Sequence, residues 1–249
     1  MGYVLLFLFA LITVEIIWSW RTEKRVYDIK DTFTNLAIFA GYQLSKYLFA
    51  GYTLAFLGFF YQYRVHTFEK SLLIFVITFF SVDFFYYWYH RASHVIKLLW
   101  AFHLVHHTSQ QMNLTVAYRL NWFSFILSPF FYVPLALIGL PPIFIVGAYA
   151  LNLLYQFFLH TEAVGKLGFL EKIIDTPSSH RVHHGSNDLY IDKNFGGVLI
   201  IWDRMFGTYQ PEEEKVKYGT TKGFAGHNPI VLVFHGFVDL VRNKMYYKG

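Results

Sequence analysis

The stretch HRASHVIKLLWAFHLVHH at residues 90–107 and the shorter stretch HRVHH at residues 180–184 together contain eight histidines. Residues three or four positions apart lie on one face of a helix, so His90 and His94 can direct both imidazoles at a single ion. The spacing HxxHH, at 103–107 and again at 180–184, likewise places its histidines on one face. Such a face is costly beside apolar residues unless something coordinates it. The two stretches therefore predict helices that bind metal ions.

The sequence around these motifs is too apolar for an ordinary soluble domain. Of its 249 residues, 55% are hydrophobic, 21% are aromatic and 15% are charged, whereas about a quarter are charged in a typical soluble domain. The chain has no cysteine, which excludes disulfides, iron–sulfur clusters and thiolate zinc sites. The net charge of +5 comes from basic residues near the ends of apolar runs, which fits lipid headgroups and predicts no nucleic-acid partner.

Long apolar runs predict an all-α, polytopic integral membrane protein with about four to five transmembrane helices. The runs are residues 2–20, 33–61, 71–89 and 122–159. They are long enough, or nearly so, to cross about 30 Å of hydrocarbon at about 1.5 Å per residue. We interpret 33–61 as one long tilted helix, and GLPP at 139–142 divides the last run into a hairpin. The apolar residues 229–240 are too short to cross and predict an interfacial helix.

Basic residues predict the orientation of these spans. Arg21, Lys24 and Arg25 follow the first run, which predicts an uncleaved anchor whose C-terminal end faces the cytoplasm. Counting spans from there places 90–121 and 160–228 together in a cytoplasmic cap, and these segments hold ten of the twelve histidines. If the second run were itself a hairpin, the side would change but the two segments would still lie together.

Nine of these histidines are the candidate metal ligands and catalytic residues. They are His90, His94, His103, His106, His107, His160, His180, His183 and His184. Nine imidazoles exceed the capacity of one centre, so we expect two metals with about four or five nitrogen ligands each. His160 is included because it falls on the same side of the membrane as the motifs, and an interfacial role is its alternative. His66, His227 and His235 have no motif context and are predicted to be surface or interface residues.

The spacing of the histidines does not by itself select the metal, because imidazole suits iron, copper, zinc and nickel. Hydrolytic zinc sites keep three ligands and typically use a carboxylate base, as in HExxH, which this chain lacks. Bis-histidine haem takes its two ligands from different helices within the bilayer. Two irons that activate dioxygen beside a lipid are the best physical match.

The motifs resemble those of the fatty acid hydroxylase and sterol desaturase superfamily of membrane di-iron enzymes. The matching pieces are HxxxH at 90–94, HxxHH at 103–107 and 180–184, His160, and the closing segments IDKNFGG at 191–197 and IWDRMFGTY at 201–209. Within the superfamily, the stretch DTPSSHRVHHG at 175–185 is most similar to the alkylglycerol monooxygenase branch and its bacterial relatives. Val95 stands where that branch is expected to carry glutamate, so no ether-lipid substrate is assigned.

This resemblance implies an O2-dependent hydroxylase or desaturase acting on a C–H bond of a lipid, such as a sterol, a fatty acyl chain or an alkylglycerol. Two iron ions would be bound by the nine histidines. The resemblance divides the single membrane domain 1–249 into N-terminal transmembrane helices at 1–81, the di-metal region at 82–210 and an interfacial tail at 211–249. The enzyme would lie in the inner or plasma membrane of a bacterium, or in the endoplasmic reticulum of a eukaryote.

Electrons are expected from outside the chain, because the sequence has no Rossmann glycine fingerprint and no cysteine for a cluster. The donor would be NAD(P)H acting through a reductase with a cytochrome or ferredoxin, or a reduced pterin. The expected partners are therefore a membrane lipid, O2, and a separate electron-transfer protein or pterin.

Two other classes of function use the same histidines. A non-catalytic metal-binding or transport protein would need ionisable residues along a path through the spans, and the candidates there are few, chiefly Glu15, Lys46 and Asp83. A membrane zinc hydrolase would act without O2.

Three further segments receive an interpretation. Asn187 and Asp188 either bond a ligand histidine through its free nitrogen or form a turn. The segment WDR at 202–204 is interpreted as a structural ion pair with an interfacial aromatic residue. The aromatic run at 84–89 is interpreted as a membrane-interface belt, with the lining of a substrate channel as the alternative.

Overall fold

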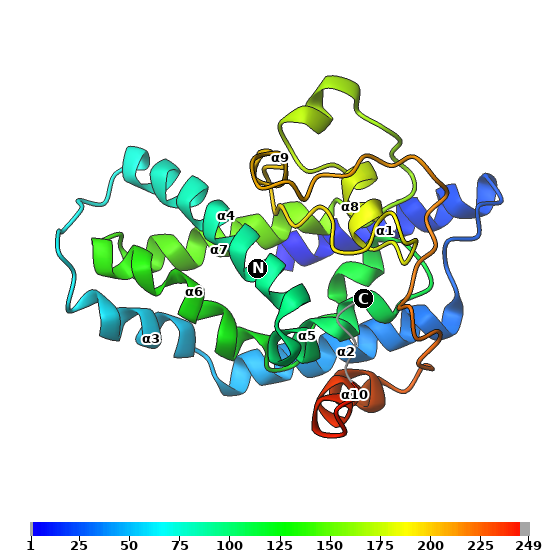
Figure 1. The fold of residues 1–249 in the computed structure, drawn as a ribbon, viewed down its shortest axis with the longest axis horizontal. Coiled ribbons are helices and arrows are strands. Elements are labelled where there is room, and N and C mark those ends of the chain that lie inside the picture. The colour runs from blue at the N-terminus through cyan, green and yellow to red at the C-terminus, as the bar shows by residue number, and fades with distance from the viewer. Residues whose placement is uncertain (1, 245–249) are drawn as a thin grey trace.

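The computed structural model describes residues 2–244, with side chains described from residue 6 onward. Within this range the chain forms α-helices and short 3-10 helices, and its β-structure is limited to two isolated bridges (Figure 1). The prediction of an all-α fold is confirmed.

Ten α-helices and three 3-10 helices follow one another in the described range. The α-helices are α1 (Gly2–Arg21), α2 (Ile29–Leu48), α3 (Tyr52–Tyr61), α4 (Leu72–Val95), α5 (Lys97–His103), α6 (Ser124–Ile138), α7 (Pro142–Phe157), α8 (Pro177–His183), α9 (Ile201–Met205) and α10 (Pro229–Val241). The 3-10 helices are η1 (Leu104–Thr108), η2 (Leu114–Tyr118) and η3 (Gly168–Lys172).

The helices α3, α4, α6 and α7 pack against one another along the long axis of the molecule (Figure 1). Their shared core includes Leu57, Val82, Tyr132 and Ile145, each at most 2% exposed. Helix α4 has both the length and the hydropathy to cross a membrane, while α3, α6, α7 and α10 are shorter apolar helices. The number of spans therefore stays a prediction.

The apolar run at 33–61 is not one helix, and that prediction was wrong. The chain leaves α2 after Leu48 and begins α3 at Tyr52. Gly51 between them adopts a left-handed conformation with φ of 85°, which glycine tolerates without the steric cost of a Cβ atom. The break gives two helices at an angle where the hydropathy pattern alone indicates continuity.

The loops at the end of the molecule away from the histidines are tied together. The Val65 amide donates to the Leu137 carbonyl at 2.8 Å, and Phe68 donates to Gly139 at 3.4 Å. Gly139 has a φ of 112°, and a Cβ atom there would lie 1.9 Å from the His66 carbonyl oxygen. Only glycine fits this close approach, so the loop at 62–71 and the α6–α7 turn form one end of the bundle.

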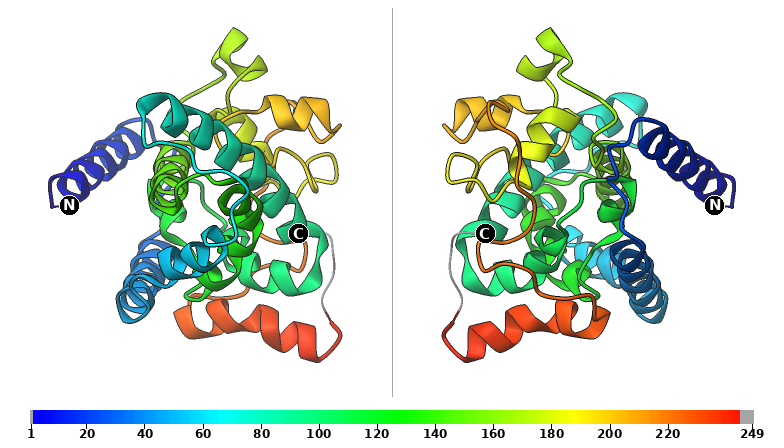
Figure 2. Two further views of the ribbon diagram at one scale, coloured as in Figure 1. Left: turned by 90° about the vertical axis from the view of Figure 1, so that its left-hand side faces the viewer. Right: turned by 90° about the vertical axis from the view of Figure 1, so that its right-hand side faces the viewer.

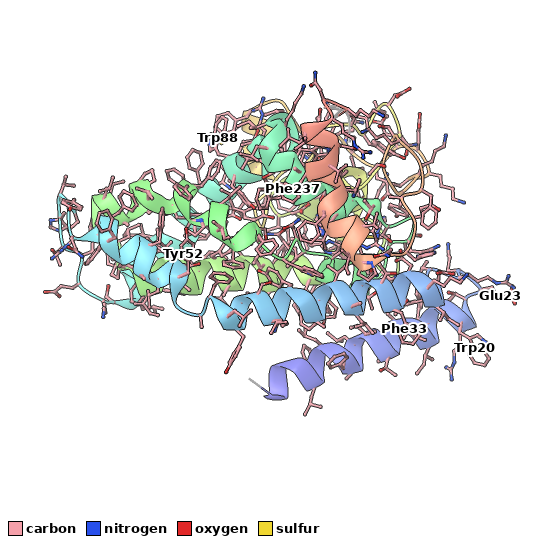
Figure 3. All side chains as sticks on the ribbon, turned by 90° about the horizontal axis from the view of Figure 1, so that it is seen from below. Trp20, Glu23, Phe33, Tyr52, Trp88 and Phe237 are labelled. Carbon is pink, nitrogen blue, oxygen red and sulfur yellow. The ribbon has the colours of Figure 1, made fainter. Side chains whose placement is uncertain are left out.

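The basic loop after α1 lies at the opposite end, with the histidines. Figure 3 shows Trp20 and Glu23 near the loop that joins α1 to α2. The Asn113 side chain donates to the Val26 carbonyl at 2.6 Å, and the Leu114 amide donates to Glu15 at 2.8 Å. The first loop therefore contacts the segment that follows the motif at 103–107.

The C-terminal helix α10 lies across the bundle rather than along it (Figure 2). It packs on α5 and α2 through Leu232, Val233 and Gly236. A Cβ atom on Gly236 would lie 2.8 Å from the Ala101 carbonyl oxygen, so glycine lets the two helices approach closely. A short helix lies where the apolar residues 229–240 predict one, and its interfacial position stays a prediction.

Candidate metal centre

All nine predicted histidines gather at one end of the helical bundle, in two adjacent groups. The first group is His90, His94, His103, His107 and His183. The second group is His106, His160, His180 and His184. Within each group the ligand nitrogens lie within 4.8 Å of one another, and every histidine except the partly buried His103 is buried. The prediction that 90–121 and 160–228 lie together is confirmed.

Each HxxHH motif divides its histidines between the two groups. In the motif at 103–107, His103 and His107 belong to the first group and His106 belongs to the second. In the motif at 180–184 the assignment is reversed: His180 and His184 belong to the second group and His183 belongs to the first. The spacing predicts one shared helix face for each motif, and the structure divides that face between the two groups. In the motif on α8, residues at i and i+4 differ by about 40° around the helix, whereas i+3 and i+4 differ by about 100°, so His183 faces the neighbouring group. The first motif passes from α5 into the 3-10 helix η1, so its division follows from the junction of these two helices.

Local sequence begins the helix that carries the second motif. Thr176 caps α8 by accepting a hydrogen bond from the Ser179 amide, and the Ser179 side chain accepts from the Thr176 amide in return. Pro177 occupies the first turn, where no backbone donor is needed. This capping box fixes the start of a helix of seven residues and hence the direction of its histidines.

The ring nitrogens approach one another at distances that suit shared metal ions. The Nε2 atoms of His90 and His103 lie 3.1 Å apart, and those of His107 and His103 lie 3.0 Å apart. In the second group, His160 Nε2 lies 3.2 Å from His106 Nε2 and 3.0 Å from His180 Nε2. Two nitrogens bound to one ion at about 2.1 Å, at angles from 90° to tetrahedral, are about 3.0–3.4 Å apart.

Three further Nε2 atoms are buried without a hydrogen-bond partner, those of His94, His183 and His184. A buried polar atom without a partner is costly. A metal ion would satisfy these nitrogens together with the closely spaced pairs, so the donor set fits two metal ions.

Backbone carbonyls fix the orientation of four rings. The Nδ1–H group of His90 donates to the Phe195 carbonyl at 2.9 Å, and that of His183 donates to the Lys193 carbonyl at 3.0 Å. In the second group, the Nδ1–H group of His106 donates to the Arg119 carbonyl at 3.3 Å, and that of His160 donates to the Gln156 carbonyl at 2.8 Å. A carbonyl oxygen can only accept, so Nδ1 carries the proton and Nε2 keeps its lone pair. This is the usual second contact of a metal-binding histidine.

Two carboxylates that the sequence reasoning missed lie beside the remaining Nδ1 atoms. Asp175 Oδ2 is 3.5 Å from His180 Nδ1, and Asp192 Oδ1 is 3.4 Å from His94 Nδ1. Asp175 is completely buried, whereas Asp192 is 33% exposed. Asp175 precedes the second HxxHH motif by five positions, but no helical or strand period relates it to His180, so spacing could not have identified it.

Burial determines the protonation state of the histidines that lie outside the predicted membrane-spanning segments. Desolvation, reinforced by the neighbouring imidazoles, lowers the pKa of His107, His183 and His184 well below the ordinary value. Burial also lowers the pKa of His160 to about 4. Neutral imidazoles carry the lone pair that a metal needs, so these side chains are ready to act as ligands at neutral pH.

The segment that follows α8 is held beside the first group by Asp203. This buried carboxylate accepts hydrogen bonds from the amides of Phe195 and Gly196, both at 2.7 Å. The predicted ion pair within residues 202–204 was wrong, because the Arg204 guanidinium lies over the Tyr209 ring, 3.6 Å from its centre. The carboxylate is needed to satisfy backbone donors, which is why it turns away from the neighbouring cation.

Asp83 holds the next part of that segment. It accepts hydrogen bonds from the Val198 amide at 2.7 Å, the Leu199 amide at 3.1 Å and the Trp202 indole at 2.9 Å. The side chain of Asn152 donates a further bond at 2.7 Å. A carboxylate so fully occupied joins α4 to the closing segment and has a structural role.

Asn187 does not contact a ligand histidine, so that alternative was wrong. Its side chain accepts from the Lys217 amide at 2.8 Å and donates to the Lys215 carbonyl at 3.1 Å. Asp188 is exposed. The side chain of Asn187 thus fastens residues 215–217 to the turn after α8.

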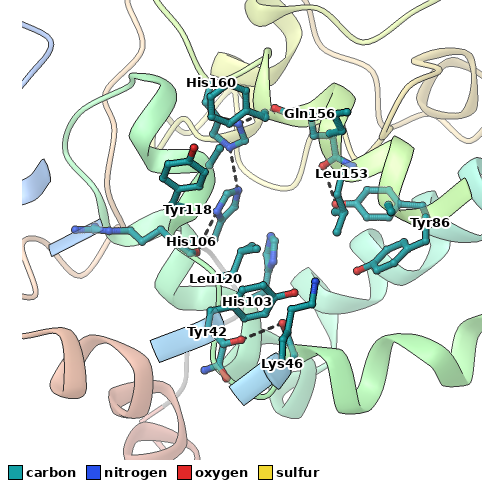
Figure 4. A pocket seen from close by; sticks show the side chains of 18 of the residues that line it. Tyr42, Lys46, Tyr86, His103, His106, Tyr118, Leu120, Leu153, Gln156 and His160 are labelled. Atoms are coloured by element: carbon teal, nitrogen blue, oxygen red, sulfur yellow. Dashed lines mark hydrogen bonds between the residues drawn. The ribbon is translucent and has the colours of Figure 1, made fainter. Parts of the chain in front are cut away.

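A cavity of about 280 Å³ adjoins both histidine groups. His103, His106 and His160 form part of its wall, which is otherwise mostly apolar and aromatic (Figure 4). Tyr86 and Tyr89 also line it. The interpretation of the run at 84–89 as an interface belt was therefore incomplete.

Phe84, Tyr87 and Trp88 face the closing segment, while Phe85 packs on the core shared by α3, α4, α6 and α7. Phe84 packs on Trp202 with ring centres 5.2 Å apart, and Tyr87 stacks on Phe206 at 5.3 Å. The run thus uses one face for the cavity and the other to anchor the segment that carries the Nδ1 partners.

Fold and site together define a helical protein with two adjoining histidine clusters beside an apolar cavity. The chain belongs to the fatty acid hydroxylase family, whose family model matches residues 75–208. The match covers the region from α4 through the closing segment, which contains all nine histidines.

Several curated relatives are alkylglycerol monooxygenases. The protein of Xenopus tropicalis is 42% identical over 217 residues, which is 86% of this chain and 48% of the relative. The human protein is 50% identical over 157 residues, covering 63% of this chain and 35% of the relative. The chain thus spans about half the length, or less, of these relatives.

A more distant relative is the ornithine lipid hydroxylase OlsE of Rhizobium tropici, 30% identical over 147 residues, which is 55% of this chain and 44% of that protein. No solved structure matches the chain.

Proposed function

We propose that this chain is an O2-dependent di-iron oxidoreductase of the hydroxylase or desaturase type that acts on a C–H bond of a membrane lipid. The observation that carries the proposal is the pair of buried imidazole groups, of five and four histidines, whose free Nε2 atoms converge beside an apolar cavity. Membership of the fatty acid hydroxylase family supports the same reaction class.

The nine histidines would hold the metals, one ion in each group. Two iron ions would supply the reduction of O2 and the oxidising power for C–H cleavage. The protein's own contribution is positional: the carbonyls of Phe195 and Gln156 and the carboxylate of Asp175 keep Nε2 of their histidines turned inward. The apolar cavity excludes water and holds a substrate carbon close to the metals.

The substrate class is a lipid, and an alkylglycerol is the first to test because the relatives with 42% and 50% identity are alkylglycerol monooxygenases. Electrons would come from outside the chain, from NAD(P)H through a reductase with a cytochrome or ferredoxin, or from a reduced pterin. The absence of cysteine supports an external donor, because the chain cannot hold an iron–sulfur cluster through thiolates.

We place the protein in a membrane with its histidine end facing the cytoplasm. The basic segment at 21–25 supports this side, because the adjoining Val26 carbonyl bonds Asn113 beside the histidine groups. We retain the division into 1–81, 82–210 and 211–249, and the family match at 75–208 supports the middle region.

A metal-transport function is less well supported. Glu15 accepts hydrogen bonds from Tyr27, Leu114 and Thr161, and Asp83 is likewise occupied. Side chains engaged in this way do not supply a chain of ligands through the bilayer. A zinc hydrolase remains the second candidate because imidazole also binds zinc.

The test is the metal content of the purified protein, measured beside O2 consumption with a chemical reductant and a mixed lipid extract. We expect about two irons per chain and O2 uptake that requires both reductant and lipid. Two zincs and no O2 uptake after iron-replete expression would reject the oxygenase and favour the hydrolase.

A further inference from the structure

The cavity beside the histidines reaches the surface of the molecule at Lys46 on α2. Lys46 lines the cavity and is itself exposed. Its neighbours Leu44, Tyr47 and Leu48 are between 58% and 79% exposed and form an apolar outer surface on α2. These side chains lie about 100–160° around the helix axis from Lys46, so the outer side of α2 is apolar, while an ammonium group stands where the cavity reaches the surface.

The charges around the cavity are unbalanced. Among the described residues that line it there are two permanent cations, Lys46 and Arg119, and no aspartate or glutamate. Arg119 is neutralised by Asp31, whose Oδ1 lies 2.8 Å from its Nη2, and it also donates to Thr108 at 3.0 Å. Lys46 has no such partner: within the described part of the chain no carboxylate lies within 4.0 Å of its Nζ.

The side chain of Lys46 is directed inward. Figure 4 shows it reaching from α2 into the cavity whose wall also holds His103 and His106. Its Nζ lies over the Tyr42 ring, 5.6 Å from the ring centre. An ammonium without a counterion in mostly apolar surroundings favours an anionic ligand.

The cavity has a volume of about 280 Å³. This space holds several water-sized groups and so admits a headgroup or the first carbons of a chain.

We infer that Lys46 binds the anionic group, phosphate or carboxylate, of a single-chain lipid at the point where the cavity reaches the surface. Oxidation of the bound lipid rests on the proposed function, whereas the binding of the anionic group does not.

The test is the affinity of the protein in lipid nanodiscs for matched ligands. The ligands are 1-O-hexadecylglycerol 3-phosphate, the neutral 1-O-hexadecylglycerol, hexadecanoate and inorganic phosphate. Hydrogen bonds to charged groups correspond to about tenfold or more in affinity, so we expect both lipid anions to bind at least about tenfold more tightly than the neutral lipid. Lys46→Met should abolish this preference and Lys46→Arg should keep it.

Lys70→Met is the matched control, because Lys70 is exposed and lies in the loop at the far end of the bundle. It should bind all ligands as the unmodified protein does. Retained preference in Lys46→Met, with Tm unchanged, would overturn the inference. Inorganic phosphate that binds as tightly as the phosphate lipid would overturn the assignment to a lipid.

Binding and turnover distinguish this inference from the proposed function. Lys46-dependent binding without O2 uptake in iron-loaded protein would reject the oxygenase and support the anion site. O2 uptake with the two anionic lipids that Lys46→Met leaves unchanged at every lipid concentration would overturn the anion site and support the oxygenase.

Discussion

The two histidine groups are supported by different parts of the chain. In the first group, the Nδ1 atoms of His90, His94 and His183 all face the short segment 192–195. In the second group, the corresponding partners of His106, His160 and His180 come from three separate places: the carbonyls of Arg119 and Gln156, and the buried carboxylate of Asp175.

This difference means that the first group depends on the single loop at 192–195, whereas the second group depends on three separate parts of the fold. Asp192 and Asn194 in that loop both have positive φ, at 57° and 56°, a conformation that costs non-glycine residues free energy. The five-histidine group has one more ligand but a single support. The four-histidine group has no ligand to spare but several independent supports.

The largest effect is expected from removing one ligand from each group. His180→Ala leaves three histidines in the second group, so we expect the metal content to fall from about two ions to about one and O2 uptake to fall by more than about 100-fold, beyond the loss seen for indirect partners. His94→Ala leaves four histidines and should retain two ions. Elemental analysis of both variants, with His235→Ala as control, decides this, and equal metal loss in the two would contradict the comparison.

The next largest effect is expected from substituting the carboxyl groups beside the two histidine groups, and its size should differ between them. Asp175→Asn removes the buried carboxyl group beside His180, and we expect metal affinity at the second group to fall about 10–100-fold. Asp192 is 33% exposed, so solvent screens it and Asp192→Asn should cost less than about tenfold. Competition with a chelator measures both affinities, and a larger loss in Asp192→Asn would reverse the proposed order.

Loss of the support for the loop should weaken the first group alone. Asp203→Ala leaves the buried amides of Phe195 and Gly196 without an acceptor, at a cost of about 1–3 kcal/mol each. We expect a lower free energy of unfolding and a lower metal occupancy of about one ion per chain after brief chelation. Asp188→Ala, which removes an exposed carboxylate, is the control, and unchanged occupancy in Asp203→Ala would show that the loop does not support the centre.

The smallest effect on the metals is expected at the other end of the bundle. Gly139→Ala introduces a Cβ atom 1.9 Å from the His66 carbonyl oxygen at a φ of 112°, which should lower the free energy of unfolding by more than about 1 kcal/mol. Both ions should nevertheless remain. Thermal unfolding and elemental analysis test this, and loss of metal would mean that the two ends are coupled.

Much of this site could be predicted from the sequence because imidazoles at helical spacing carry a strong signal. The motifs identified eight of the nine histidines, and counting spans added His160. The division of each HxxHH motif between two groups could not be predicted, because it depends on how η1 and α8 face each other across the bundle.

Residues that act through long-range contacts were also missed. Asp175, Asp192 and Asp203 have no periodic relation to the histidines or amides they serve. The break at Gly51 lies within an unbroken apolar run, where composition gives no sign of a left-handed residue. Charge and hydropathy predicted which segments lie together, but not which atoms touch.

The exchange of middle histidines between the two groups links the assembly of the centres. An ion bound by His180 and His184 would hold α8 in place and with it His183 for the other ion, and an ion bound by His103 and His107 would hold His106 in the same way. Since binding at one centre removes disorder that the other must otherwise overcome, we expect the two ions to load with positive cooperativity. In the unmodified protein, in which both groups are complete, half-loaded molecules should then be scarce at every metal concentration.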